Sequence, residues 1–367
     1  MADSAANQSE SKCKRMKLSP DKDTAVGSTD RISNLPDSLL CHILYFLPTN
    51  EAIVTSILSS RWKPLWTLVP KIDLHDTSIT GHSVSPLRIR YIVLAQHTTP
   101  ILSNFTLSWH SPCDSSHFDK WIDTAISRSL QQLDLHIESK QLFELPHAVF
   151  HCKTLVSLEL SGEIELDPPP SFQLSSLKIL GLYEKCYTSH NSFSSLCSAS
   201  ACPSLEDLKV VRDDNYICIG FGSIYPSMFQ NLVRLNFKVT RTNWHVLQSL
   251  LVVAPDLKVL VIDKDYYYKN QLCWMEPPDG PGCLSLHLTT FNFNGFEELE
   301  HEVEFIKYIL KEARALNRVT IKVSDLHSKE SVLKKLSIFP RQSSTCLLTV
   351  ELGSIEGTRV FYVLQGR

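Results

Sequence analysis

The chain has 367 residues, 43% of them hydrophobic, and a formal net charge of −3. This near-neutral balance gives no reason to expect nucleic acid or an anionic membrane as the main partner. No window of eighteen or more apolar residues is present, which excludes a transmembrane helix, and the N-terminus lacks the apolar core of a signal peptide. We expect a nuclear or cytoplasmic protein with two or three domains.

Residues 1–29 are polar, small and charged, so they cannot bury enough apolar surface to fold. We expect a disordered tail. It contains the basic segment Lys12–Pro20 (KCKRMKLSP), which is compatible either with nuclear import or with an ordinary solvated tail.

An unusually apolar stretch follows at Leu35–Trp66 (LPDSLLCHILYFLPTNEAIVTSILSSRWKPLW). Pro36 suits the first turn of a helix, because its missing N–H would have no partner there. Apolar residues then recur at helical spacing until Pro48 ends the helix. The residues of this apolar stripe are Leu39, Leu40, Ile43, Leu44 and Leu47.

Two shorter helical segments complete the stretch. Thr49 can cap a second helix over about Asn50–Leu58, and a third, irregular turn around Pro64 carries both tryptophans. Three such helices make a core too small to be stable alone. Their excess apolar surface must therefore be covered either by the rest of this chain or by a second protein.

Residues Asp30–Trp66 resemble the F-box of plant F-box/leucine-rich-repeat proteins, through the DRIS lead-in, the LPD motif, the ILYFLPT turn and the RW…LW close. The resemblance implies docking to a Skp-family adaptor and, through it, to cullin and RING subunits of a ubiquitin ligase. The first contacts expected are Leu35, Pro36, Leu39, Leu40, Ile43, Leu44, Leu47 and Pro48. Ile53, Leu58, Trp62 and Trp66 are expected to divide between the F-box core and the adaptor.

From about residue 100 the pattern apolar-x-x-apolar-x-apolar recurs nine times. Each copy predicts a short strand, and stacked copies share one core, so we expect a parallel sheet along a curved solenoid. Phe118–Ser129 and Asn243–Pro255 are predicted to be return helices. No asparagine ladder is present, which indicates an irregular arc. The copies begin at Leu102, Leu130, Leu155, Leu177, Leu205, Leu232, Leu257, Leu288 and Leu316.

The segment Phe296–Val323 contains the longest predicted helix, followed by a strand. With the segments on either side it resembles the FBD domain that ends many plant F-box/leucine-rich-repeat chains. We expect it to cap an exposed sheet edge. The predicted apolar face of this helix is Val303, Ile306, Ile309, Leu310 and Ala313.

The predicted fold class is therefore α/β. A short three-helix F-box at 30–72 precedes an irregular leucine-rich-repeat solenoid with a parallel sheet at 73–270. An FBD region and C-terminal cap occupy 271–367.

A search for chemistry finds no catalytic motif: no G-x-S-x-G elbow, no HExxH, and no phosphate loop, since the glycines at Gly220 and Gly222 lack a following lysine. The carboxylates of Arg212–Asn215 are expected in a solvated loop. The eleven scattered cysteines are expected to be small buried hydrophobes rather than disulfides.

His147 and His151, beside Cys152, are the best metal candidates in the sequence. A zinc site needs further ligands, and only His136 is conceivable, so surface histidines beside a buried cysteine are expected instead. We predict no metal, no cofactor and no enzymatic activity.

The inner face of the solenoid is the predicted target surface, because residues between the buried strand positions point toward it. Tyr266 and Tyr267 follow a repeat strand and either contact a partner or pack against the next loop. We expect a substrate-recognition subunit of a ubiquitin ligase; the alternative is a non-catalytic repeat scaffold without ubiquitin transfer. The other candidate target-binding residues are Asp134, His136, Tyr183, Lys209, Arg234 and Lys238.

Overall fold

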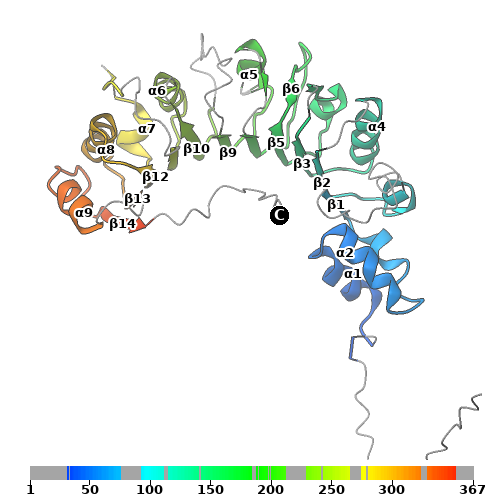
Figure 1. Ribbon diagram of the computed structural model, residues 1–367. Helices are drawn as coiled ribbons and strands as arrows, with labels where there is room; N and C mark the ends of the chain where they lie inside the picture. Colours follow the sequence, from blue (N-terminus) through cyan, green and yellow to red (C-terminus); the bar gives the residue numbers. More distant parts are fainter. Residues whose placement is uncertain are drawn as a thin grey trace, which may run out of the picture.

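The computed structural model describes residues 31–32, 34–75, 92–110, 115–139, 142–183, 187–188, 190–196, 198, 200–211, 229–240, 243–264, 274–277, 280–323 and 329–352. These residues form an arch with strands along its inner side and helices along its outer side (Figure 1). A small helical unit extends from the N-terminal end of the arch. The predicted tail, residues 1–29, lies outside the described residues.

The inner side of the arch is a parallel sheet that has eleven strands among the described residues. These strands follow one another in chain order, and three further short strands form a separate sheet. The repeat pattern predicts nine of them, β2 through β13, but not β1 or β14. The strands are β1 (Lys71–His75), β2 (Asn104–Trp109), β3 (Gln132–Ile137), β5 (Ser157–Gly162), β7 (Ile179–Tyr183), β9 (Asp207–Val211), β10 (Arg234–Val239), β11 (Val259–Lys264), β12 (Thr290–Phe296), β13 (Arg318–Val323) and β14 (Leu347–Leu352).

The register of this sheet explains the repeat pattern. Leu107, Leu135 and Leu160 occupy the same register position on three neighbouring strands, and all three are fully buried. The residues between them along each strand are partly exposed on the opposite face, the inner side of the arch. Each repeat thus completes the core of its neighbours, as expected for a solenoid.

The outer side is covered by helices and by a second small sheet. The predicted return helices are present as α4 (Ser115–Ile126) and α6 (Trp244–Val253). No described helix has both the length and the apolar character needed to cross a bilayer. The remaining outer elements are α5 (His190–Leu196), α7 (Gly282–Leu286), the 3-10 helix η4 (His147–His151), and a parallel sheet of β4 (Phe143–Glu144), β6 (Ile164–Leu166) and β8 (Tyr187–Thr188).

The C-terminal region continues the same sheet. Helix α8 (Glu300–Glu312) lies between β12 and β13, and α9 (Lys329–Ser337) precedes the last described strand, β14. The Phe305 ring of α8 packs edge-on against Trp274, with 4.6 Å between centroids. Of the predicted apolar face, Val303 is partly buried, and the fully or almost fully buried residues are Ile306, Ile309, Leu310 and Ala313.

In the N-terminal unit, three short helices each begin directly after a proline: α1 (Asp37–Tyr45), α2 (Thr49–Val54) and the 3-10 helix η2 (Leu65–Leu68). The second helix, predicted over Asn50–Leu58, changes after Val54 into a 3-10 turn, η1 (Thr55–Ile57). At this point the Thr55 hydroxyl donates to the Ala52 carbonyl at 2.7 Å, a local bond that competes with regular helix geometry.

Candidate functional site

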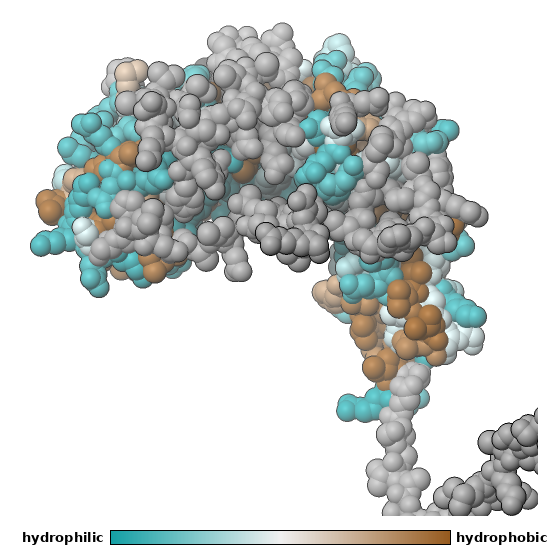
Figure 2. Space-filling model, in the orientation of Figure 1, coloured by the Kyte–Doolittle hydropathy of each residue, from teal (hydrophilic) through white to brown (hydrophobic). Residues whose placement is uncertain are grey.

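The N-terminal unit exposes a set of large apolar side chains, which we call the apolar face. Leu39, Ile43 and Phe46 follow one another at helical spacing along α1 and its end, so they share one side of the helix. Figure 2 shows hydrophobic residues gathered over this unit. The members of the apolar face, exposed by 45% to 82%, are Leu39, Ile43, Phe46, Val54, Ile57 and Leu58.

The predicted adaptor contacts divide by burial. Pro36, Leu39, Ile43 and Leu58 are exposed, while Leu35, Leu47, Pro48 and Ile53 are partly buried. The structure corrects the prediction of Leu40 and Leu44 as first contacts, because they are at most 1% exposed and lie in the core. Trp62 and Trp66, which are expected to divide between the F-box core and the adaptor, are 5% and 6% exposed and therefore belong to the core.

The reason for this burial is the packing of α1 against η2, which places Leu40 and Leu44 inside the chain's own core. Their role is to hold the unit together. Conversely, Phe46, Val54 and Ile57 are absent from the predicted set although they are 70%, 60% and 82% exposed. Phe46 could have been found, because it extends the stripe of Leu39 and Ile43 by one turn.

Specific hydrogen bonds fix this unit to the first strands of the arch. The Tyr45 hydroxyl donates to Oδ1 of Asn104 on β2 at 3.2 Å. The backbone N–H of Asp73 on β1 donates to Oγ1 of the buried Thr49 at 2.8 Å. The apolar face is therefore held at a defined end of the solenoid.

A buried histidine strengthens the same junction. His97 is 2% exposed, and its Nε2 lies 2.7 Å from the carbonyl oxygen of Val69. Arg128 donates to the His97 carbonyl at 3.0 Å. Burial, with the Arg128 charge as a smaller contribution, lowers the pKa of His97 to about 4. The imidazole is thus neutral near pH 7 and bridges the unit to the solenoid.

The inner face carries a compact polar cluster at the middle of the arch. Lys209 on β9 reaches Glu159 on β5 at 3.0 Å, and the Tyr183 hydroxyl lies 3.5 Å from the same carboxylate. Gly181 lies between Glu159 and Lys209 in the sheet, and a β-carbon there would lie 2.7 Å from Cε2 of Tyr183, so the tyrosine ring would have to shift. Burial, the largest single effect, would lower the pKa of Lys209, but the hydrogen bond to Glu159 and the charges of Tyr183, Glu159 and Asp207 together outweigh it, so the pKa is raised.

The other predicted target residues are spread over the same face. Arg234 on β10 lies 3.7 Å from Asp207, whose pKa is raised by burial despite the neighbouring cations. Asp134 and His136 are on β3, and Lys238 is on β10. Tyr266, Tyr267 and the Arg212–Asn215 and Gly220–Gly222 segments lie outside the described residues. This face offers mixed, largely paired charges, which suit a protein or peptide ligand.

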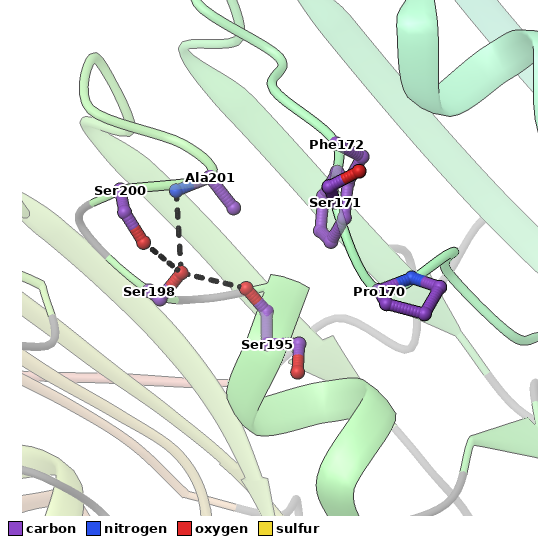
Figure 3. Close-up of a pocket in the computed structure, with 7 residues that line it drawn as sticks. All are labelled: Pro170, Ser171, Phe172, Ser195, Ser198, Ser200 and Ala201. Carbon is purple, nitrogen blue, oxygen red and sulfur yellow. Dashed lines mark hydrogen bonds between the residues drawn. The ribbon is translucent and has the colours of Figure 1, made fainter.

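The pocket beside α5 offers little basis for catalysis. Its described lining, seven residues from Pro170 to Ala201, has no titratable side chain. The Ser198 hydroxyl donates to the Ser195 carbonyl at 2.8 Å and accepts from the N–H of Ala201 at 3.2 Å (Figure 3). A nucleophilic serine needs an adjacent base, so this arrangement does not support hydrolysis.

The histidine pair singled out in the sequence does not form a metal centre with its neighbour. His147 and His151 are exposed on η4, and the buried Cys152 thiol lies 3.7 Å from the Leu130 carbonyl. A different group does assemble: one ligand atom from each of His110, His136 and Glu138, all within 4.8 Å of one another.

Five cysteines lie in the described part of the chain, and all five are free. Four of them are buried, as the sequence predicts for small hydrophobes. Burial raises the pKa of both Cys202 and Cys283 to about 12, which keeps these thiols protonated and unreactive.

Comparison with known families gives three matches in chain order. Residues 32–73 match the F-box domain family. Residues 118–224 match the LRR repeats of FBD-associated F-box protein At5g56370, and residues 276–321 match the FBD family. These matches confirm the resemblance and the fold class predicted from the sequence.

Relatives from Arabidopsis thaliana align over most of the chain. F-box/FBD/LRR-repeat protein At4g26340 is 27% identical, with 87% of this chain and 99% of the relative covered. F-box/FBD/LRR-repeat protein At3g26920 is 27% identical and FBD-associated F-box protein At3g52670 is 26% identical, each covering 88% of this chain and 97% of the relative. The similarity therefore extends over most of this chain and nearly the whole length of each relative.

Proposed function

We propose that this chain, a relative of the F-box/FBD/LRR-repeat proteins over most of its length, is the substrate-recognition subunit of an SCF-type (Skp–cullin–F-box) ubiquitin ligase. Its F-box docks a Skp-family adaptor and, through it, the cullin and RING subunits. Its repeats bind a target protein, which becomes ubiquitinated. The observation that carries this proposal is the exposed apolar face of the N-terminal unit.

The apolar face favours a protein partner on energetic grounds. Each large apolar side chain contributes about 1.5–3 kcal/mol when it passes from full exposure to full burial. Isolated exposed hydrophobes are ordinary, but a contiguous set on one small unit is typical of an interaction site. Ile57, at 82% exposure, and Phe46, at 70%, have most of this free energy still available.

In this function the chain acts as a tether and catalyses no step. Binding the target on the inner face and the adaptor on the apolar face raises the effective concentration of target lysines near the charged conjugating enzyme. The hydrogen bonds of Tyr45 and Thr49 to the first strands favour a fixed orientation between the two surfaces. A fixed orientation reduces the entropy lost when the complex assembles.

A charge placed on the apolar face tests the proposal. The full-length Leu39→Glu/Ile43→Glu variant should retain its circular dichroism spectrum, because both side chains are almost half exposed. It should lose capture of a purified plant Skp-family adaptor, since the carboxylates would be desolvated at the interface.

The matched control is Val252→Glu on α6, a 59% exposed position far from the N-terminal unit along the chain. It should capture the adaptor as the unchanged protein does. Unchanged capture by the folded double variant would refute adaptor docking through this face. Adaptor capture without co-purification of a cullin from cells would instead indicate a scaffold without ubiquitin transfer.

A further inference from the structure

We propose that His110, His136 and Glu138 form a binding site for a single divalent transition-metal ion of the zinc type. We call these three residues the His–His–Glu cluster. His136 belongs to β3, while His110 and Glu138 directly follow the ends of β2 and β3. The cluster thus lies at the carboxyl ends of two adjacent strands, outside the surfaces assigned above to the adaptor.

The distances from the two imidazoles to the Glu138 carboxylate are close to those between ligands of a tetrahedral metal ion. Nε2 of His136 lies 3.2 Å from Oε1 of Glu138, and Nε2 of His110 lies 3.5 Å from Oε2. Zinc binds imidazole nitrogen and carboxylate oxygen at about 2.0–2.2 Å, which places two tetrahedral ligands about 3.4 Å apart. Since the ligand atoms of all three residues lie within 4.8 Å of one another, an ion could enter after a modest movement of the side chains.

The backbone holds these residues in place. The N–H of Glu138 donates to the carbonyl of Trp109 at 2.7 Å, which joins the chain just before His110 to the residue that supplies the carboxylate. Trp109 and Ile137 are paired in the parallel register and are 2% and 1% exposed. Because the site is built on strand ends whose adjoining residues are buried, its backbone geometry is fixed before the ion binds.

The donor set has the chemistry of a transition-metal site rather than a calcium or magnesium site. Two imidazoles and one carboxylate suit zinc and its neighbours, whereas calcium and magnesium prefer oxygen ligands alone. The histidine side chains are only 22% and 13% exposed, and Glu138 is 53% exposed. Among the described residues no fourth ligand joins the cluster, so a water molecule would complete the coordination.

Without a metal, the same geometry would represent only a carboxylate that accepts hydrogen bonds from two imidazoles. Zinc titration of the full-length protein by calorimetry separates the two possibilities. We expect one site per chain, and at least about a tenfold loss of affinity in each of His110→Gln, His136→Gln and Glu138→Gln. Cobalt substitution should give the visible absorption of a four-coordinate ion in the unchanged protein but not in the three cluster variants.

The control is His147→Gln/His151→Gln, which removes two exposed histidines from another element and should leave zinc affinity unchanged. Each variant is first compared with the unchanged protein by circular dichroism without metal. Glu138→Gln alters the most exposed member and should fold even if a histidine variant does not. No zinc binding by the unchanged chain, or equal loss in the control and cluster variants, would overturn the proposal.

Discussion

Gly162 ends β5 with a φ of +90°, a backbone conformation that residues with a side chain rarely adopt. A β-carbon at this position would lie 1.9 Å from the carbonyl oxygen of Ile137, on the neighbouring strand. Gly162→Ala must therefore either strain the backbone or push β3 and β5 apart. We predict a loss of at least about 2 kcal/mol in the free energy of unfolding, measured in urea.

Gly282 provides the control for this substitution. It is the first residue of α7, and a β-carbon there would meet no atom within 4 Å. Gly282→Ala should leave stability unchanged or raise it slightly, because alanine is the better helix former. Similar losses at the two glycines would show that crowding and backbone conformation at Gly162 are not the cause.

His97 makes stability depend on pH in a defined window. Burial lowers its pKa in the folded chain to about 4, from an ordinary value of 6.5. Below pH 6.5 the unfolded chain binds a proton at this residue while the folded chain does not, so the folded state loses stability as the pH falls toward 4. The full contribution is about 3 kcal/mol, present above pH 6.5 and lost at pH 4.

The measurement is the free energy of unfolding between pH 7.5 and 4 for the unchanged chain and for His97→Gln. Glutamine can still donate to Val69 but does not titrate in this range. The curve of the variant should fall less steeply between about pH 6.5 and 4. Parallel curves would show that another group, and not His97, is responsible for the acid sensitivity.

At the scale of elements, α8 is fixed to the sheet by a buried ion pair. Lys264, at the end of β11, bonds to Glu302 in the first turn of α8 and to Glu297 at 2.8 Å. The Glu302 carboxylate also accepts backbone N–H groups of Glu297 and Leu299 at 3.0 and 3.2 Å. Glu302 has no exposed surface, and burial raises its pKa even beside the lysine.

The two partners of this pair should respond unequally to substitution. Lys264→Met leaves the Glu302 carboxylate buried without a cation, which costs about 3–5 kcal/mol. Glu302→Gln should cost less, because Glu297 still neutralises the Lys264 ammonium. Urea unfolding checks the order. Lys311→Met, on an exposed pair of the same helix, should give no measurable change, and a comparable loss there would contradict the role of burial.

The strands show what sequence patterns can and cannot predict. Nine strands follow from the repeated apolar triplet because sheet packing forces the same three positions to be buried in every copy. β1 also has the triplet, at Val69, Ile72 and Leu74. The repeat series does not include this triplet, because it lies next to the N-terminal unit, well before the regular series that begins at Leu102. β14 breaks the triplet, since the register position equivalent to Leu316 is occupied by Thr345.

The candidate sites could be predicted from the sequence only in part. The exposed part of the apolar face could be predicted from helical spacing, but the burial of Leu40 and Leu44 required the position of η2. The His–His–Glu cluster forms no sequence motif, because His110 lies one repeat before His136 and Glu138. His110 and Glu138 have the same offset from Phe105 and Leu133, which pair in the sheet, so an alignment of the repeats places them next to each other.

At the scale of the whole molecule, the arch and the N-terminal unit share one continuous core. The buried set runs from Leu40 in α1, through Trp66 and Ile72, to the strands of the solenoid. In Figure 1 the unit extends from one end of the arch, while the C-terminal strands lie at the other. The apolar face and the inner face of the arch are therefore joined by packed elements and not by a linker, so a change at the junction should affect both.

Thr49 allows this coupling to be tested. Thr49→Val keeps the side-chain shape but removes the oxygen that accepts the Asp73 N–H, so it should destabilise the chain by about 1–3 kcal/mol. Thr55→Val removes a hydroxyl whose bond to Ala52 stays within one turn, and it should cost less than about 0.5 kcal/mol. In hydrogen exchange, Thr49→Val should accelerate amides of both α2 and β1. Acceleration confined to α2 would mean that the unit opens independently and that its orientation to the repeats is not fixed by this bond.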